Sequence, residues 1–212
     1  MADQRVSTLA LGAGDSIGGN LSLDFANTNS WDPTDRSHGE RLRTYTDLLN
    51  WSHSEGLISR RVQGQLLRHA GTDPGAADSA LAAALDLRRH LHDIFRAFAA
   101  GSRPHRASMT TFNRFLNDLS PQLRYEARGI AWDWRVGPPD LKSVLRPVVW
   151  AAAQLMRSED LRRVKICAGE RCGWLFVDRS RRHNRRWCDM RDCGNRAKVK
   201  RHYYRHRGTN PA

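Results

Sequence analysis

Long apolar runs are missing from this sequence. Although 40% of its 212 residues are hydrophobic, no stretch approaches the roughly 20 apolar residues that cross a bilayer. The opening segment MADQRVSTLALGAGDS has one arginine before a very short apolar stretch, so it lacks the core of a secretory signal peptide. We therefore expect a cytoplasmic protein with no membrane span, in a compartment where thiols stay reduced.

Sequence patterns that carry catalysis are also missing. We find no GxSxG, HExxH, P-loop or GxGxxG motif. Asp24, His38, Glu40 and His53 could be combined into an acid–base site, but nothing in the sequence fixes their geometry. We therefore expect a protein that is not an enzyme, and a ligand-binding enzyme with a basic tail is the third-ranked hypothesis.

Acidic residues are scarce in the last quarter of the chain. Residues 162–212 hold 16 lysines and arginines against four acidic residues, whereas residues 1–161 hold 19 against 18. The formal net charge of +13 therefore belongs almost entirely to this last part. A segment with this imbalance repels itself unless it has a partner, which indicates a polyanion. Nucleic acid is favoured over an acidic protein or an anionic lipid surface.

Helical periodicity dominates residues 20–158. The clearest segment is 76–100, where Leu87, Leu91, Ile94 and Phe98 share one face and Gly101 follows the end. The segment GGNLSLDFANT fits a strand or a helix equally well. Further helices are predicted around 42–52, 59–70, 109–119 and 141–155; Pro147 should kink the last one or mark its true start.

A change of period interrupts the helices. The segments QLRYEA and IAWDWRV flank RG, which is typical of a β-hairpin. The predicted fold is therefore mostly α, in the α+β class. A helical N-terminal domain with a β-hairpin covers 20–158. A small C-terminal module covers 162–207 and holds all four cysteines of the chain, and we predict that it is a treble-clef-like zinc finger.

Cysteine occurs only four times, always within 27 residues, as Cys167, Cys172, Cys188 and Cys193. In the spacing C-x4-C-x15-C-x4-C, each close pair of cysteines can bind the same ion from two sides. Four thiolates can surround Zn²⁺ tetrahedrally and leave no position for water. A segment with so few apolar residues would struggle to fold without metal, so the predicted zinc is structural. Two disulfides are the main alternative, and a redox role is another.

The insert between the cysteine pairs is expected to fold as a hairpin. WLFVD at 174–178 reads as a strand, RSRRHN as a turn and RRW at 185–187 as the return strand. A helix should follow from about Asp192, with Val199 and Tyr203 packed on the hairpin. The predicted miniature core comprises Trp174, Phe176, Trp187 and Val199.

The turn and the helix carry the candidate nucleic-acid contacts. Arginine guanidinium groups form paired hydrogen bonds with phosphate and with the edges of guanine bases, and tyrosine rings stack on bases. Sequence does not separate DNA from RNA, so an RNA- or ribosome-associated zinc protein is the second hypothesis. The candidates are Arg181, Arg182, Arg185, Arg186, Arg196, Lys198, Lys200, Arg201, Tyr204 and Arg205.

A polar cluster lies near the start of the helical domain. Asn27 and Thr28 could form the floor of a pocket for a small-molecule effector. Arg43 could bind the anionic group of that effector. The favoured alternative is that Asn27 and Thr28 tie this segment to the helices by buried hydrogen bonds. The domain could equally form a homodimer through the 76–100 helix or the hairpin edge.

Two motifs resemble known families. CGNR at 193–196, with WLFVDRSRRHNRRWC upstream, resembles the CGNR zinc finger; GNLSLDFANT and LRTYTDLLNWSHSEGLIS resemble the ABATE domain that accompanies it. The resemblance implies a bacterial stress-induced transcription regulator, with zinc on the four cysteines and DNA on the finger. Within the motif, a side chain at Gly194 is expected to crowd the tight turn or the metal. Asn195 could cap the helix or bond a thiolate, and Arg196 could cover the thiolates or reach phosphate.

Overall fold

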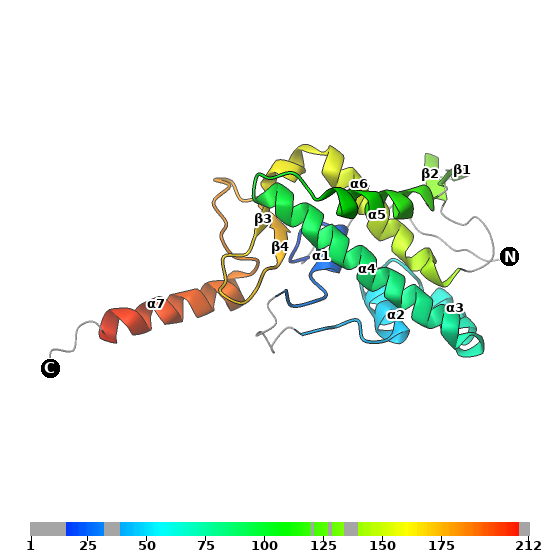
Figure 1. Cartoon of the computed structure of the whole chain (residues 1–212), viewed down its shortest axis with the longest axis horizontal. Helices are drawn as coiled ribbons and strands as arrows, with labels where there is room; N and C mark the ends of the chain where they lie inside the picture. The colour runs from blue at the N-terminus through cyan, green and yellow to red at the C-terminus, as the bar shows by residue number, and fades with distance from the viewer. Residues whose placement is uncertain (1–15, 32–38, 120, 127–128, 134–139, 208–212) are drawn as a thin grey trace.

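A helical body carries a small finger at one end, and the last helix projects away from both (Figure 1). The computed structural model describes residues 16–31, 39–119, 121–126, 129–133 and 140–207. Among these residues no helix is both long and apolar enough to span a membrane. The helices of the body are α1 (Leu21–Ala26), α2 (Tyr45–Ser54), α3 (Arg60–Thr72), α4 (Pro74–Ala99), α5 (Arg106–Asn117) and α6 (Arg146–Arg157).

Helix α4 is the central element of the body, and it confirms the helix predicted over 76–100. Asp73 caps its first turn by accepting from the backbone N–H of Ala76 at 2.9 Å, and Pro74 occupies the first position. Gly101 follows its end with φ at +67°, a conformation that favours glycine. Its apolar face is buried against helices α1, α2, α3 and α5. The predicted helices around 42–52, 59–70 and 109–119 correspond to α2, α3 and α5.

The segment that fitted strand and helix equally well is a helix, α1. Asn20 caps it by accepting from the backbone N–H of Ser22 at 2.9 Å. Leu23 and Phe25 are both fully buried, although they lie on different sides of the helix. Because α1 is surrounded by α4, α6 and the strand β4, it has no solvent face wide enough to produce a clear helical period.

Pro147 marks the start of a helix, one of the two predicted outcomes. A 3₁₀ helix η1 (Leu141–Leu145) precedes α6, and Pro147 lies in the first turn of α6, where its missing N–H leaves no hydrogen bond unmade. The hydroxyl of Tyr45 donates to the carbonyl of Leu141 at 2.8 Å, which fastens η1 to α2.

The predicted hairpin is present as β1 (Gln122–Glu126) and β2 (Gly129–Asp133), paired antiparallel. Its register places Leu123 and Tyr125 on one face, with Ile130 opposite Tyr125. These three side chains are 62%, 84% and 64% exposed, so this face of the hairpin lies against solvent.

The finger's sheet differs from the predicted one. Strand β4 (Leu175–Val177) pairs antiparallel with β3 (Val164–Ile166), which follows the 3₁₀ helix η2 (Glu159–Arg163). The predicted return strand over 185–187 is wrong. Strand β3 occupies one edge of β4, and on the other edge Asn27 and Gly18 bond the backbone of Leu175 and Val177. The knuckle between Cys167 and Cys172 is the turn of this hairpin, so the first cysteine pair closes the sheet rather than preceding it.

Strand β4 joins the finger to the helical body. Leu175 and Val177 belong to the main core with the helices, whereas Phe176 packs in a second core with Trp174 and the cysteines. This division follows from the alternation of side chains along a strand. It explains why LFV is apolar throughout: both faces of β4 are buried.

Helix α7 (Asn195–Arg207) does not fold back on the finger. Val199 is 62% exposed and Tyr203 is 49% exposed, so the predicted packing of both on the hairpin is wrong. Val199 also drops out of the predicted miniature core, which retains Trp174 and Phe176 as buried members and Trp187 as a partly buried one. The main packing partner of α7 is η3 (Met190–Gly194), a single π-helical turn.

Candidate metal centre and basic surface

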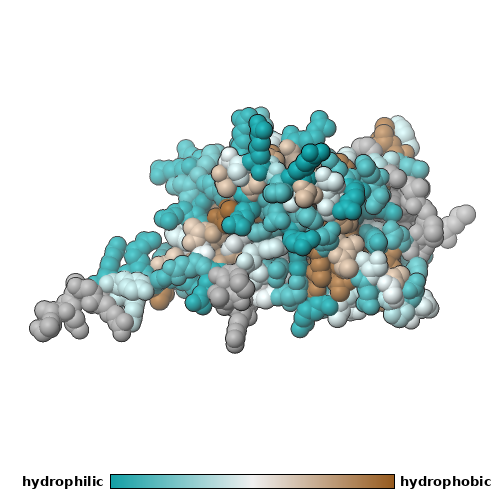
Figure 2. Space-filling view, viewed as in Figure 1, coloured by the Kyte–Doolittle hydropathy of each residue, from teal (hydrophilic) through white to brown (hydrophobic). Residues whose placement is uncertain are grey.

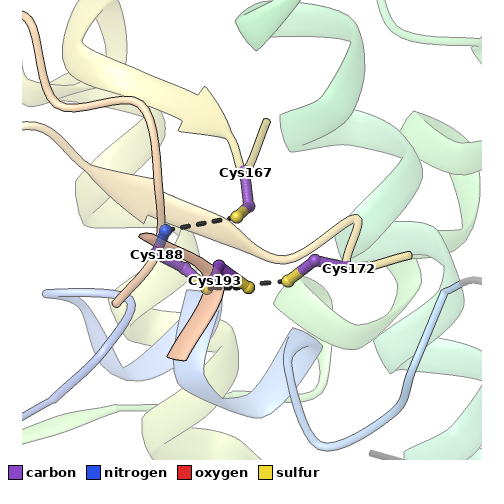
Figure 3. Close-up of side chains that lie close together, drawn as sticks. All are labelled: Cys167, Cys172, Cys188 and Cys193. Atoms are coloured by element: carbon purple, nitrogen blue, oxygen red, sulfur yellow. Dashed lines mark hydrogen bonds between the residues drawn. The ribbon is translucent and has the colours of Figure 1, made fainter. Parts of the chain in front are cut away.

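The four cysteine sulfurs converge on one point (Figure 3). Their Sγ atoms all lie within 4.8 Å of one another, and all four residues are buried. Cys188 Sγ is 3.6 Å from Cys172 Sγ and 3.7 Å from Cys193 Sγ. Four sulfurs bound about 2.3 Å from one tetrahedral ion lie about 3.8 Å apart, whereas a disulfide joins sulfurs at about 2.05 Å. The spacing fits a shared metal ion and does not fit two disulfides.

Backbone geometry places each pair of ligands. The N–H of Cys167 donates to the carbonyl of Trp174 at 2.8 Å and so extends the ladder of β3 and β4 into the knuckle. Cys188 lies two residues before η3 and Cys193 lies within it. Asp189 caps this turn, with its carboxylate accepting from the N–H of Arg191 at 2.7 Å. One pair therefore comes from a hairpin and the other from the turn that starts α7.

Hydrogen bonds and mutual repulsion set the charge of the cluster. Thiol donation from Cys172 and Cys188, with backbone N–H groups, holds the pKa of Cys167 well below its usual range. Donation to Cys167 raises the pKa of Cys188, and burial raises the pKa of Cys193. Apart from Cys167, the cysteines are therefore held toward the thiol form by their neighbours and by burial. A divalent ion would make all four thiolates favourable.

The lining of the site also fits a bound ion. A Cβ atom on Gly169 would lie 3.1 Å from Cys193 Sγ and 3.4 Å from Cys167 Sγ, so a side chain there would press on the sulfurs. The N–H groups of Gly169 and Cys188 donate to Cys167 Sγ at 3.4 and 3.3 Å. Four thiolates complete a tetrahedral shell and leave no open position, as in a structural site.

Residues of the CGNR motif support the sulfurs. The Arg196 guanidinium donates to Cys193 Sγ at 3.1 Å and pairs with Asp192 at 3.3 Å, so one of its two predicted roles, covering the thiolates, is present. A Cβ on Gly194 would lie 2.8 Å from the sulfur of Met190 rather than near the metal ligands.

Asp178 is a functional residue that sequence reasoning missed. It is fully buried and accepts from Lys165 Nζ at 2.6 Å, from Ser180 and from the backbone N–H of Arg185 at 3.0 Å. Burial raises its pKa, but these hydrogen bonds outweigh burial and hold the pKa well below its usual range. Asp178 thereby fixes the arginine-rich loop 179–186. Its signal in the sequence is a lone carboxylate ending an apolar strand.

The residues predicted to contact nucleic acid differ in the contacts that they make within the protein. Arg185 is committed to the fold: its guanidinium donates to the carbonyls of Trp187 and Cys188 and lies 4.5 Å over the ring of Phe176. Lys200 pairs with Glu170 on the surface. The others lie exposed on the loop and on α7: Arg181, Arg182, Arg186, Lys198, Arg201, Tyr204 and Arg205.

The polar cluster at the end of α1 is a joint between body and finger. The side-chain amide of Asn27 donates to the carbonyl of Leu175 at 2.8 Å and accepts from its N–H at 2.9 Å. Thr28 donates to the carbonyl of Phe25 and accepts from Arg88 at 3.2 Å. Arg43 pairs with Asp47 at 3.8 Å on the surface, apart from both. These contacts are of the kind expected from the structural alternative.

The residues considered for catalysis have separate surroundings. Asp24 accepts from Ser16 and from the N–H of Gly18, and burial raises its pKa. Glu40 forms a two-pronged ion pair with Arg88, and His53 contacts the carbonyl of Ile58 at 3.0 Å. His38 lies outside the described residues.

The two elements considered for homodimer formation differ in exposure. Helix α4 buries its apolar face in the core, whereas the β1–β2 hairpin turns Leu123, Tyr125 and Ile130 to solvent. Self-association through the hairpin stays a prediction.

Fold and site together define a helical domain that carries a four-cysteine finger. Family comparisons agree: residues 163–206 match the CGNR zinc finger, and residues 19–159 match ABATE, described as "Putative stress-induced transcription regulator". Because the second match covers more than half of the chain, the protein belongs to the ABATE family and ends in a CGNR zinc finger. A search of the curated proteins finds no match.

Proposed function

We propose that this protein is a cytoplasmic transcription regulator that binds duplex DNA through a zinc-held finger. The observation that carries the proposal is α7, which projects from the body (Figure 1). Residues 198–205 are all exposed, and the helix has six basic residues and no acidic one. The projecting end is mostly hydrophilic in surface view (Figure 2).

The energetics of α7 favour a polyanionic partner. An isolated helix of 13 residues is marginal in water, and close like charges weaken it further. The finger contacts the first half of α7, where Arg196 donates to Cys193 Sγ and Lys200 pairs with Glu170. Phosphates along its length would neutralise Lys198, Arg201 and Arg205 and so stabilise the helix.

The shape of α7 favours DNA over RNA. An α-helix with its side chains is about 10–12 Å wide, which matches the roughly 12 Å major groove of B-form DNA. The major groove of A-form RNA is too narrow for side chains to read. Thirteen helical residues span about 20 Å, enough to contact several successive bases and phosphates.

Zinc has a structural role in this proposal. Cys167 and Cys172 would hold it from the knuckle, and Cys188 and Cys193 would hold it from the start of α7. When bound, the ion supplies a fixed tetrahedral link between these segments. It thereby sets the direction in which α7 leaves the finger.

The test is binding of the full chain to labelled duplex DNA, double-stranded RNA and tRNA over a range of salt concentrations. We expect tightest binding to duplex DNA, with log affinity falling steeply against log salt. Lys198→Gln with Arg201→Gln should reduce that slope by about 0.9 for each phosphate that the variant no longer neutralises. Arg60→Gln with Arg103→Gln, on the exposed surface of the body, is the matched control.

Each alternative has its own outcome in the same experiment. Preference for RNA would favour an RNA- or ribosome-associated zinc protein. Equal affinity for all duplex sequences would count against operator recognition, for which a preference of at least about a thousandfold is usual. Loss of binding by the control pair would show that the finger is not the interface.

A further inference from the structure

A cavity of about 390 Å³ lies in the helical body, walled by α4, α5, η1 and α6. None of its lining residues is among the four cysteines or the proposed DNA contacts. Volumes of this order hold small organic ligands. The cavity is also separate from Asn27, Thr28 and Arg43, where an effector pocket was considered.

One part of the cavity lining is apolar. Phe115 and Leu119 come from α5 and the residues that follow it, whereas Leu145 and Val149 come from η1 and α6. Leu119, Leu145 and Val149 are at most 3% exposed, so each presents only a small part of its surface to the cavity. Such a lining favours a ligand with an apolar body.

Several charged groups at the cavity already have protein partners. Arg146 lies 3.7 Å from Asp140. Asp86 pairs with Arg89 at 2.7 Å and lies 3.4 Å from His90. These pairs reduce the charge that each group can offer to a ligand.

The remaining charged groups give the cavity a positive balance. Arg114 donates to the hydroxyl of Thr111 at 3.0 Å, a neutral partner that leaves its charge uncompensated. Neither Lys142 nor Asp118 has an ion pair with another residue in the described part of the chain. Among the described residues, two cations and one anion at the cavity therefore have no ion pair, and this excess of one positive charge favours a ligand with one net negative charge.

We propose that this cavity binds a small organic carboxylate. Arg114 and Lys142 hold the carboxylate by charge-assisted hydrogen bonds, and the apolar part of the molecule packs on Phe115, Leu119 and Val149. The proposal does not depend on the DNA proposal, because the two sites share no residue. A ligand here would also touch α4, the helix that reaches the finger through His92.

The test is calorimetric titration of the full chain with benzoate and hexanoate, beside the neutral amides benzamide and hexanamide. We expect saturable binding of at least one carboxylate with a Kd of about 1 mM or tighter, and at least about tenfold weaker binding of its amide. Arg114→Gln with Lys142→Gln should weaken carboxylate binding by about tenfold or more. Arg103→Gln, exposed and outside the cavity, should leave it unchanged.

A second variant tests the cavity itself. Ala83→Phe places a ring in the space that Ala83 lines, so it should abolish binding without changing the charges. The fold of each variant is checked by circular dichroism, and Arg114 and Lys142 are exposed, so their substitution should leave the fold intact. Absence of saturable binding by both carboxylates, equal binding of acid and amide, or an unchanged affinity in the double variant would overturn the proposal.

Discussion

His92 shows how a single residue of the body is tied to the finger. Its ring stacks on Trp31 with centroids 3.7 Å apart, and its Nε2 donates to the carbonyl of Gly173 at 3.1 Å, next to the knuckle. Because the carbonyl can only accept, the neutral ring carries its proton on Nε2. Burial lowers the pKa of His92 to about 4, so the folded protein holds this ring neutral.

We expect His92 to make the protein less stable as pH falls. The unfolded chain takes up the proton near pH 6.5, whereas the folded chain does so only near pH 4. Stability is therefore complete above about pH 6.5 and declines down to about pH 4, by roughly 3 kcal/mol in all. Urea unfolding at pH 7 and pH 5 measures this decline.

The control for this prediction is His92→Gln, whose amide can still donate to Gly173 but does not titrate. Protonation of the thiolates contributes equally to both proteins, so the difference between their pH profiles isolates the histidine. An equally steep decline in His92→Gln would contradict the prediction.

Single residues of the finger differ in how far the sequence predicts their position and role. The four cysteines could be found from spacing alone, because metal ligands need a specific chemistry. Arg185 could not be assigned a structural role in the finger, because an arginine in an arginine-rich segment looks the same in the sequence whether it faces solvent or the protein. Arg185 packs on the ring of Phe176 and donates to two carbonyls, and only the folded chain brings these groups together.

Short sequence patterns predicted helices α2 to α6 and the β1–β2 hairpin. Ser59 caps α3 by accepting from the N–H of Val62, and Gly56 follows the end of α2 with a positive φ. Both signals act within one helical turn, so they can be found from neighbouring residues in the sequence. The partner of β4 could not be predicted in the same way. Strand β3 has only three residues, and its period is too short to distinguish it from the end of a helix.

Among the helices, we expect α7 to depend most on a metal ion bound by the four cysteines. Replacing Cys188 with serine removes one thiolate and should release the ion, because a hydroxyl is a poor zinc ligand. We expect metal content to fall from about one ion per chain to a small fraction of that, and α7 to lose its anchored first turn. Metal analysis and hydrogen exchange of residues 188–207 measure the two effects.

Met190→Leu is the matched control for Cys188→Ser. Met190 lies in the same segment and is 48% exposed, but it contributes no metal ligand. It should keep the metal and the hydrogen-exchange rates that α7 has in the unmodified chain. Full protection of α7 in metal-free Cys188→Ser would show that zinc does not set this helix.

For the whole molecule, the two family matches meet at residues 159–163, but the cores do not separate there. Val164, Leu175 and Val177 of the finger belong to the main core of the helical body. Burial of each such side chain contributes about 1.5–3 kcal/mol, a substantial share of the roughly 5–15 kcal/mol by which a domain is stable. Neither part is therefore expected to fold normally alone.

We accordingly expect the body and the finger to unfold in one transition. Loss of helical circular dichroism and release of zinc to a colorimetric chelator should coincide during urea unfolding. Asn27→Ala should shift both signals together, because it leaves the N–H and carbonyl of Leu175 without partners; the expected loss is about 3 kcal/mol. Asn113→Ala, at an exposed position on α5, should shift neither. Zinc release well before the loss of helix in the unmodified chain would mean that the finger opens by itself, and that the shared core does not couple the two parts.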